Sequence, residues 1–332
     1  MAETIALVGG ETLLGREIRD VLAETALGRQ LRLVAAVDEE SGTLTEIGGE
    51  PAFLAKLDTD AVEDAAVVIL AGSAESSKVA IEANPSALII DLTYAAEQDP
   101  AARIRAPQVE GSDYERDHTG PQIVAHPAAT AVAMVLKRLH ANYPILRAVV
   151  HIFGPASEYG LPGIDELQQQ TANLLTFQPV PKKVFDTQLA YAMLAQLGSE
   201  APVPLGERED RIERHVASLL ERMDGVPMPS LRLIQAPVFH GFSFSFWVEF
   251  DEAPGASDIE DAMSTAMDNE VFDVRAGDLE PPNNVGVAGQ SGIAVGAITP
   301  DRNSGSAFWI WAAADNLRLA AESAAMIAGE TV

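Results

Sequence analysis

A glycine-rich turn near the start of the sequence has the composition and spacing of a phosphate-binding loop. It runs from Gly9 to Gly15, between the apolar segment 4–9 and a stretch with helical spacing at 13–24. Glycine allows a tight turn and close approach of the backbone to a phosphate, and the N-terminus of the following helix attracts an anion. Thr12 stands at the middle position, where such loops carry a glycine.

These residues predict a dinucleotide site at the ends of the neighbouring apolar segments. A turn of a parallel sheet that binds nothing fits them equally well. The predicted cofactor contacts are Gly9, Thr12, Leu13, Leu14 and Gly15 in the turn, and Gly72 and Ser73 after the third apolar segment.

The acid that ends the second apolar segment indicates which dinucleotide this turn would take. Asp38 follows the segment 31–37, where an acid in a dinucleotide fold accepts a hydrogen bond from the ribose 2′-hydroxyl and repels a 2′-phosphate. Glu39 and Glu40 add to the repulsion. If a cofactor binds, we therefore expect NAD rather than NADP, although a solvated acidic turn explains the same residues.

The overall composition excludes several classes of function. The 332 residues include no cysteine, which rules out disulfides, thiolate metal sites and a thiol nucleophile. A net charge of −27 repels phosphate backbones, so we expect no nucleic-acid partner. The N-terminus lacks the pattern of a signal peptide and no long apolar stretch occurs, so we expect a cytoplasmic protein without a membrane span.

The elements that must position these residues alternate in the first half of the chain. Apolar segments at 4–9, 31–37, 66–70 and 87–90 are separated by helical spacing, which predicts a parallel sheet of βαβ units. The second half mixes predicted helices at 131–140, 165–175, 186–197, 208–221 and 315–327 with predicted strands at 147–153, 231–238, 243–250, 293–298 and 307–312. Alternation along 243–250 predicts one buried face, and the charges of 208–221, Arg208 among them, are read as solvated.

Six segments along nearly the whole chain carry motifs of a known family. They are IALVGGETLLGREIRDVL, HPAATAVAMVLKRLH, VVHIFGPASEYGLPGIDEL, QLAYAML, QAPVFHGF and WAAADNLRLAAESAAMIA. The set resembles the aspartate-semialdehyde dehydrogenase family, and QAPVF followed by HGF resembles its divergent USG-1-like branch.

The resemblance implies an α/β protein of two domains. A Rossmann-like parallel-sheet domain for the nucleotide is expected at 1–128 and 305–332. An inserted α+β catalytic and dimerisation domain is expected at 129–304, with a homodimer or a dimer of dimers as the assembly. The segment that packs back onto the nucleotide domain adds Asn316 as a cofactor contact.

The same resemblance implies that the family's reacting groups are missing. Family members reduce β-aspartyl phosphate with NADPH, sometimes NADH, through a cysteine nucleophile, a proton-handling histidine and anion-binding arginines. The nucleophile's place is taken by Ala129, whose methyl group cannot form a thioester. The other positions of the family set are occupied by Gly154 for a glutamine, Phe242 for the histidine, and Gln235 and Glu97 for arginines.

Three side chains could replace the lost groups. His240 lies two residues before Phe242 and would share its face on a strand, and His126 lies beside Ala129 at the entrance of a helix. Together they could form an acid–base or metal pair, although structural histidines explain both, and we expect no metal. Thr130 would need an activating base.

The sequence therefore favours a catalytically silent homologue that binds or regulates, with an unidentified small-molecule ligand. The first alternative is an active NAD(P)-dependent semialdehyde dehydrogenase. The second is a different reaction on the old scaffold, using His126, His240, Tyr159 or Thr130. Glu158 and Tyr159 replace small family residues and are expected to fill part of the substrate pocket.

Overall fold

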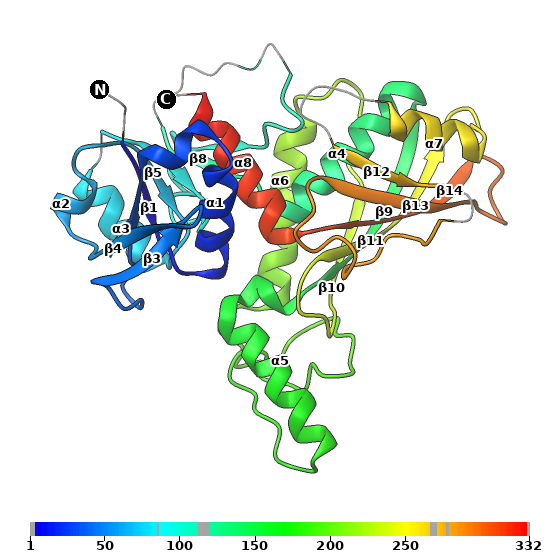
Figure 1. Ribbon diagram of the computed structural model, residues 1–332. Helices are drawn as coiled ribbons and strands as arrows, with labels where there is room; N and C mark the ends of the chain where they lie inside the picture. The colour runs from blue at the N-terminus through cyan, green and yellow to red at the C-terminus, as the bar shows by residue number, and fades with distance from the viewer. Residues whose placement is uncertain are drawn as a thin grey trace. The chain divides into compact units, whose positions relative to one another are not determined.

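The computed structural model describes residues 4–84, 86–111, 114, 120–265, 271–276 and 279–330. The chain divides into two compact units, Met1–Ala125 with Ala320–Val332, and His126–Leu319. Both are mixed α/β structures, and Figure 1 follows them along the chain. In the described part of the chain, no helix is both long and apolar enough to cross a bilayer.

The first unit is built on an eight-stranded sheet in the order β3-β4-β2-β1-β5-β6-β8-β7. The strands are β1 (Thr4–Val8), β2 (Leu31–Val34), β3 (Thr43–Ile47), β4 (Glu50–Ala55), β5 (Ala65–Leu70), β6 (Leu88–Asp91), β7 (Arg103–Arg105) and β8 (Gln122–Val124). All neighbours run parallel except the β3–β4 hairpin. The four predicted apolar strands are confirmed as β1, β2, β5 and β6.

Helices cover both faces of this sheet, as burial of a parallel sheet requires. On one face α1 (Leu13–Ala23) and the later part of α8 (Asn316–Gly329) pack against β1, with Ile18 and Ala324 in one core with Leu7. On the other face lie the short α2 (Thr59–Val62) and α3 (Ala74–Ala83). The first unit therefore has the doubly wound arrangement expected of a Rossmann-like domain.

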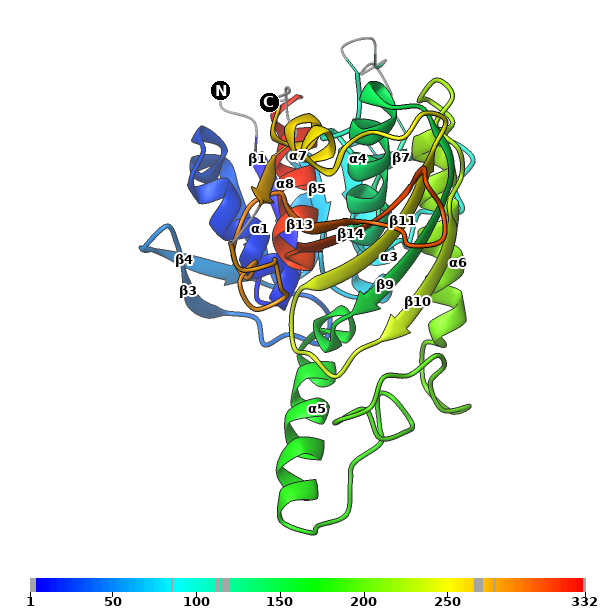
Figure 2. The ribbon, with the colours of Figure 1, turned by 90° about the vertical axis from the view of Figure 1, so that its right-hand side faces the viewer.

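The second unit is built on a six-stranded mixed sheet in the order β10-β9-β11-β14-β13-β12. The strands are β9 (Ile145–Gly154), β10 (Ser230–Gln235), β11 (Phe242–Phe250), β12 (Phe272–Arg275), β13 (Ile293–Pro300) and β14 (Ala307–Ala314). Helices α4 (Pro127–Asn142), α6 (Leu205–Leu220) and α7 (Ala256–Ser264) contact β9, β10 and β13 in turn (Figure 2). The predicted alternation is confirmed, because β11 buries every second residue from Phe242 to Phe250.

The expected domain division and the structure differ near the C-terminus. The segment from 305 was assigned to the first domain, yet β14 pairs with β11 and β13 inside the second unit. The chain returns to the first unit only at Ala320, within α8. Edge-to-edge hydrogen bonding of β14, which its apolar composition does not reveal, decides the boundary.

The predicted helix at 186–197 is wrong. Asp186 and Tyr191 have positive φ values of 49° and 64°, which a right-handed helix does not allow. The buried Gln170 of α5 (Gly160–Leu175) accepts backbone hydrogen bonds from this segment, and Leu194 forms a bridge with Gln235. The segment satisfies its backbone through these partners instead of through a helix.

Candidate functional site

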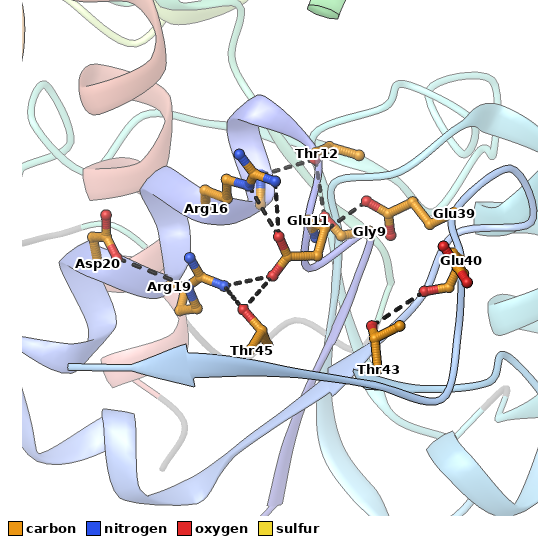
Figure 3. Close-up of polar contacts among 11 residues, drawn as sticks. Gly9, Glu11, Thr12, Arg16, Arg19, Asp20, Glu39, Glu40, Thr43 and Thr45 are labelled. Atoms are coloured by element: carbon orange, nitrogen blue, oxygen red, sulfur yellow. Dashed lines mark hydrogen bonds and ion pairs between the residues drawn. The ribbon is translucent and has the colours of Figure 1, made fainter. Parts of the chain in front are cut away.

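The glycine turn between β1 and α1 is held together by Thr12 (Figure 3). The Thr12 hydroxyl accepts a hydrogen bond from Gly15 N at 2.9 Å and lies 2.9 Å from the carbonyl oxygens of Gly9 and Ala71. Thr12 is therefore the N-cap of α1, a role that threonine performs well. The cap takes one of the helix N–H groups, and those of Leu13 and Leu14 are left at the open end of the helix.

Close packing explains two glycines of this turn, Gly9 and Gly15. A Cβ at Gly9, whose φ is 89°, would lie 2.5 Å from the Cα of Gly72. A Cβ at Gly15 would overlap the carbonyl oxygen of Gly9. The turn is thus pressed against the end of β5, and the spacing that suggested a phosphate loop is required by the fold itself.

Glu39, and not Asp38, is the acid that faces the turn. Asp38 is exposed to solvent, whereas the two carboxylate oxygens of Glu39 accept hydrogen bonds from Glu11 N at 3.1 Å and Ala36 N at 2.7 Å. Burial raises the pKa of Glu39, although these two backbone donors oppose the shift. Three consecutive acids give no sequence signal for which one turns inward, and the contact of Asp38 with a cofactor stays a prediction.

Serine side chains tie the ends of β2 and β5 together beside the turn. Ser73 caps α3 by accepting a hydrogen bond from Ser76 N at 3.2 Å. The Ser76 hydroxyl in turn accepts from Val37 N at 2.8 Å. Gly72 packs against Ala36. The predicted cofactor contacts therefore lie together beyond the C-terminal ends of β1 and β5; they are Gly9, Thr12, Gly15, Gly72 and Ser73.

A second cluster, inside the second unit, brings several predicted positions together. One cavity of about 10 Å³ has room for roughly one water molecule. Its lining residues are His126, Gly154, Glu158, Arg208, Ile212, Leu233, Gln235 and Phe242. Gln235 donates its side-chain N–H to the Gly154 carbonyl at 2.9 Å, so two of the expected family positions satisfy each other.

Both ring nitrogens of His126 are engaged in this cluster. Nε2 lies 3.0 Å from the Glu158 carboxylate, and Nδ1 accepts a hydrogen bond from Ala128 N at 3.2 Å. The His126 backbone N–H donates to Nδ1 of His215, which lies 89 positions later in the chain. His126 is thus the N-cap of α4 and is oriented by a carboxylate.

Glu158 is the centre of the cluster. Arg208 donates to its carboxylate at 3.3 Å and to its backbone carbonyl at 2.7 Å, and Asn316 donates to the other carboxylate oxygen at 3.1 Å. Burial by itself raises the pKa of Glu158, but His126, Arg208 and Asn316 together bring that pKa below its ordinary value. Arg208 also stacks 3.9 Å above the ring of Tyr159.

The sequence missed Arg208 and His215 as members of this cluster. Arg208 was read as a solvated helix charge, but its side chain is 15% exposed and paired with Glu158, 50 positions away. Asn316 was predicted to contact a cofactor. Its carbonyl accepts from Ser157 and Gly241 while its amide donates to Glu158, so its side chain makes three hydrogen bonds inside the second unit.

The remaining candidate side chains have different surroundings. Ala129 is fully buried in the first turn of α4, and the buried Thr130 hydroxyl has no hydrogen-bond partner within the described ranges. His240 does not share a strand with Phe242, because β11 begins at Phe242 and Gly241 has a φ of 78°. Across the described residues, no group of three His, Asp or Glu side chains could hold a metal ion.

The two sheets define an α/β protein with a Rossmann-like unit and a second unit built on a mixed sheet. Residues 136–319, more than half of the chain, match the family model described as semialdehyde dehydrogenase, dimerisation domain. The chain therefore belongs to the semialdehyde dehydrogenase family.

Individual relatives extend the likeness over nearly the full length. The chain is 25% identical to an aspartate-semialdehyde dehydrogenase of Rickettsia bellii, over 99% of this chain and 97% of the relative. It is 27% identical to a USG-1 protein homolog of Pseudomonas aeruginosa, over 98% and 96%. The solved structure of a probable aspartate-semialdehyde dehydrogenase from Pseudomonas aeruginosa has the same fold, with a TM-score of 0.85 at 23% identity over 99% of this chain and 98% of that one.

Proposed function

We propose that this chain is a homologue of aspartate-semialdehyde dehydrogenase that has lost the family reaction and now serves as a binding or regulatory protein. The observation that carries the proposal is the absence of any cysteine among its 332 residues. Ala129 stands where the resemblance puts the nucleophile, at the first turn of α4. A methyl group offers no electron pair for attack on an acyl phosphate.

The polar cluster around Glu158 supports this proposal. A cavity of about 10 Å³ does not admit a dicarboxylate or its phosphate. The carboxylate of Glu158 already occupies the hydrogen-bond donors of Arg208 and Asn316, which would otherwise be available to an anionic substrate. The second unit thus holds its own carboxylate where a ligand would need these groups.

The decisive test measures NADPH- and NADH-dependent turnover of aspartate semialdehyde in the presence of phosphate. The protein is purified from a host that lacks its own enzyme of this kind. We expect no turnover above background, since loss of a nucleophile in well-studied enzymes removes roughly 10⁶-fold of the rate. A robust rate under these conditions would refute the proposal.

We further propose that the first unit retains a site for a nicotinamide dinucleotide of the NAD class. The β1–turn–α1 arrangement and the acid that faces the turn support it. A thermal-shift titration with NAD, NADH, NADP and NADPH checks it. At about a hundred times the dissociation constant, binding adds roughly 2.7 kcal/mol to the free energy of unfolding.

The open face of the six-stranded sheet supports a homodimer. The face carries a hollow of about 390 Å³ lined by apolar and aromatic groups, among them Pro281, Trp309 and Trp311. Ring contacts such as Phe153 with Trp311 continue it across the sheet. We propose that a second copy of this chain covers this face, and an association of two such dimers is the larger assembly to look for.

A different reaction in the same cluster is the second candidate function. The observation that favours it is the contact of His126 with Glu158, because a carboxylate that orients a histidine is typical of acid–base sites. A screen of small metabolites by nuclear magnetic resonance would test it. Chemical conversion that His126→Gln abolishes would support this second candidate over a silent protein.

A further inference from the structure

The acidic turn after β2 reaches into the glycine turn through one side chain. Figure 3 shows the Glu39 carboxylate beside Glu11. Its two oxygens bridge the two turns, accepting from Glu11 N at 3.1 Å and from Ala36 N at 2.7 Å. Glu39 N donates to the Ala36 carbonyl at 3.0 Å, which closes a small loop around the contact. The Glu39 carboxylate, an anion that belongs to the protein itself, therefore accepts hydrogen bonds from backbone N–H groups beside the glycine turn.

The position of Glu11 is fixed from the opposite side. Its carboxylate accepts from Arg19 at 2.7 Å, from Thr45 of β3 at 2.6 Å and from Arg16 at 3.0 Å. Figure 3 shows these groups gathered on the side of α1 and β3, while the Glu11 backbone N–H serves Glu39. Three donors thus hold the Glu11 side chain on one side, while its backbone N–H donates to Glu39 on the other. The contact is built into the unit and does not depend on a loosely held surface residue.

A phosphate that approaches this turn needs the same kind of backbone donor. The ribose hydroxyl groups of a dinucleotide can donate hydrogen bonds to the Glu39 carboxylate and replace Glu11 N as its donor. The Glu11 N–H then becomes available to a phosphate of the dinucleotide. A phosphate on the ribose 2′ position has no such donor in its dianionic form and is repelled by the charge. This inference rests on the proposed retention of a nucleotide site in the first unit.

We propose that Glu39 is an internal occupant of the dinucleotide turn that a nucleotide must displace, and that its charge selects a free ribose 2′-hydroxyl over a 2′-phosphate. Glu39 is then a specificity-determining residue, while Glu11, Arg16 and Arg19 are positioning residues. Asp38, which is exposed, contributes only screened repulsion. This assigns to Glu39 the role that the sequence gave to its neighbour.

Calorimetric titrations of NAD and NADP into the full chain test the selection. The variants are Glu39→Gln, which keeps an acceptor but removes the charge, and Asp38→Asn as the matched control. We expect the wild type to prefer NAD, and Glu39→Gln to reduce the ratio of the NADP and NAD dissociation constants about tenfold, or about 1.4 kcal/mol. In Asp38→Asn the ratio should change less than about twofold.

Hydrogen exchange of the protein without nucleotide tests the internal occupancy separately. In Glu39→Ala the amides of Glu11 and Ala36 should exchange about tenfold faster or more than in the wild type, because they lose their acceptor. In Asp38→Asn both rates should be unchanged. Equal effects of the two substitutions on the binding ratio, or unchanged exchange in Glu39→Ala, would overturn the proposal.

The outcomes also separate this inference from the function on which it rests. Binding of both dinucleotides with the same ratio in wild type and Glu39→Gln would overturn the role of Glu39 and leave the nucleotide site standing. If wild type, Glu39→Gln and Glu39→Ala all bind neither dinucleotide, both the role of Glu39 and the proposed nucleotide site are overturned. Binding by Glu39→Ala but not by the wild type would support the internal occupant directly.

Discussion

At the scale of single residues, the unusual feature of this protein is the carboxylate of Glu158. Moving a carboxylate out of water costs several kcal/mol unless donors replace the water. Here His126, Arg208 and Asn316 supply them within 3.0 to 3.3 Å. Removal of the Glu158 charge therefore leaves the buried donor groups of His126, Arg208 and Asn316 without the carboxylate that they contact.

We predict that Glu158→Gln lowers the free energy of unfolding by about 3 kcal/mol at neutral pH. The amide keeps the shape but removes the charge that faces Arg208. Urea denaturation measures the effect, and Glu213→Gln on the exposed side of α6 is the control, expected within about 0.5 kcal/mol of the wild type. A neutral effect of Glu158→Gln would show that the cluster is not a buried ion pair.

The difference in the free energy of unfolding between wild type and Glu158→Gln should depend on pH. The pKa of Glu158 is lowered in the folded protein, so its stabilising contribution is present above the ordinary carboxyl pKa and is lost as pH falls through the lowered value. The stability difference between wild type and Glu158→Gln should therefore narrow on acidification below that ordinary value of 4.5. A stability difference that widens in acid would contradict a lowered pKa for Glu158.

Ala129→Cys tests whether the nucleophile alone is missing. We predict that it gives no semialdehyde dehydrogenase activity, because the resemblance puts Gly154, Gln235 and Phe242 at the positions of the other family groups. Turnover by Ala129→Cys, checked against Ala128→Cys, would show that the site is otherwise intact.

At the scale of elements, the β1–turn–α1 junction depends on closeness of backbone. Gly15 lies in the first turn of α1, where a side chain would strike the Gly9 carbonyl, while Gly10 in the glycine turn has room for a methyl group at ordinary contact distances. The glycines in this turn are therefore not equivalent, although the sequence presents them alike.

We predict that Gly15→Ala destabilises the protein by about 1–3 kcal/mol through overpacking. Gly10→Ala should be near neutral, since its Cβ would approach Leu33 and Leu54 no closer than 3.4 Å. Chemical denaturation followed by circular dichroism compares the two. An equal decrease in the free energy of unfolding in both variants would contradict this prediction, because it would mean that the backbone around Gly15 shifts to accept a methyl group.

The elements also show where reasoning from local pattern succeeds and fails. Strands β1 and β5 were predicted because a parallel strand buried on both faces is apolar throughout. The segment 186–197 has helical composition, but the buried side chain of Gln170 takes its backbone N–H groups. Tertiary contacts outweigh propensities of a few tenths of a kcal/mol per residue.

At the scale of the whole molecule, the six-stranded sheet has one covered and one open face. Helices pack on the side of Phe244 and Phe246, whereas Trp309 on the other side is 39% exposed. The indole N–H groups of Trp247 and Trp309 both donate to Asp301, which fixes the rings in place. A preformed aromatic face of this kind is suited to a second copy of the chain.

We predict that Trp309→Lys shifts the protein from dimer to monomer. A lysine at the centre of the open face would have to lose its hydration in the interface. Sedimentation velocity measures the assembly, and Leu44→Lys, at a position of β3 that is 78% exposed, is the control expected to leave it unchanged. An unchanged dimer in Trp309→Lys would place the interface on another surface.

The sequence by itself determined the parallel sheet of the first unit, the glycine turn and the absence of any thiol chemistry. Each of these follows from composition or from a period of two to four residues, which the chain carries locally. Only the tertiary structure decided that Glu39 and not Asp38 faces the turn, and that Arg208 meets Glu158. Those pairings join residues up to 50 positions apart, and they depend on how strands and helices pack, which no local pattern encodes.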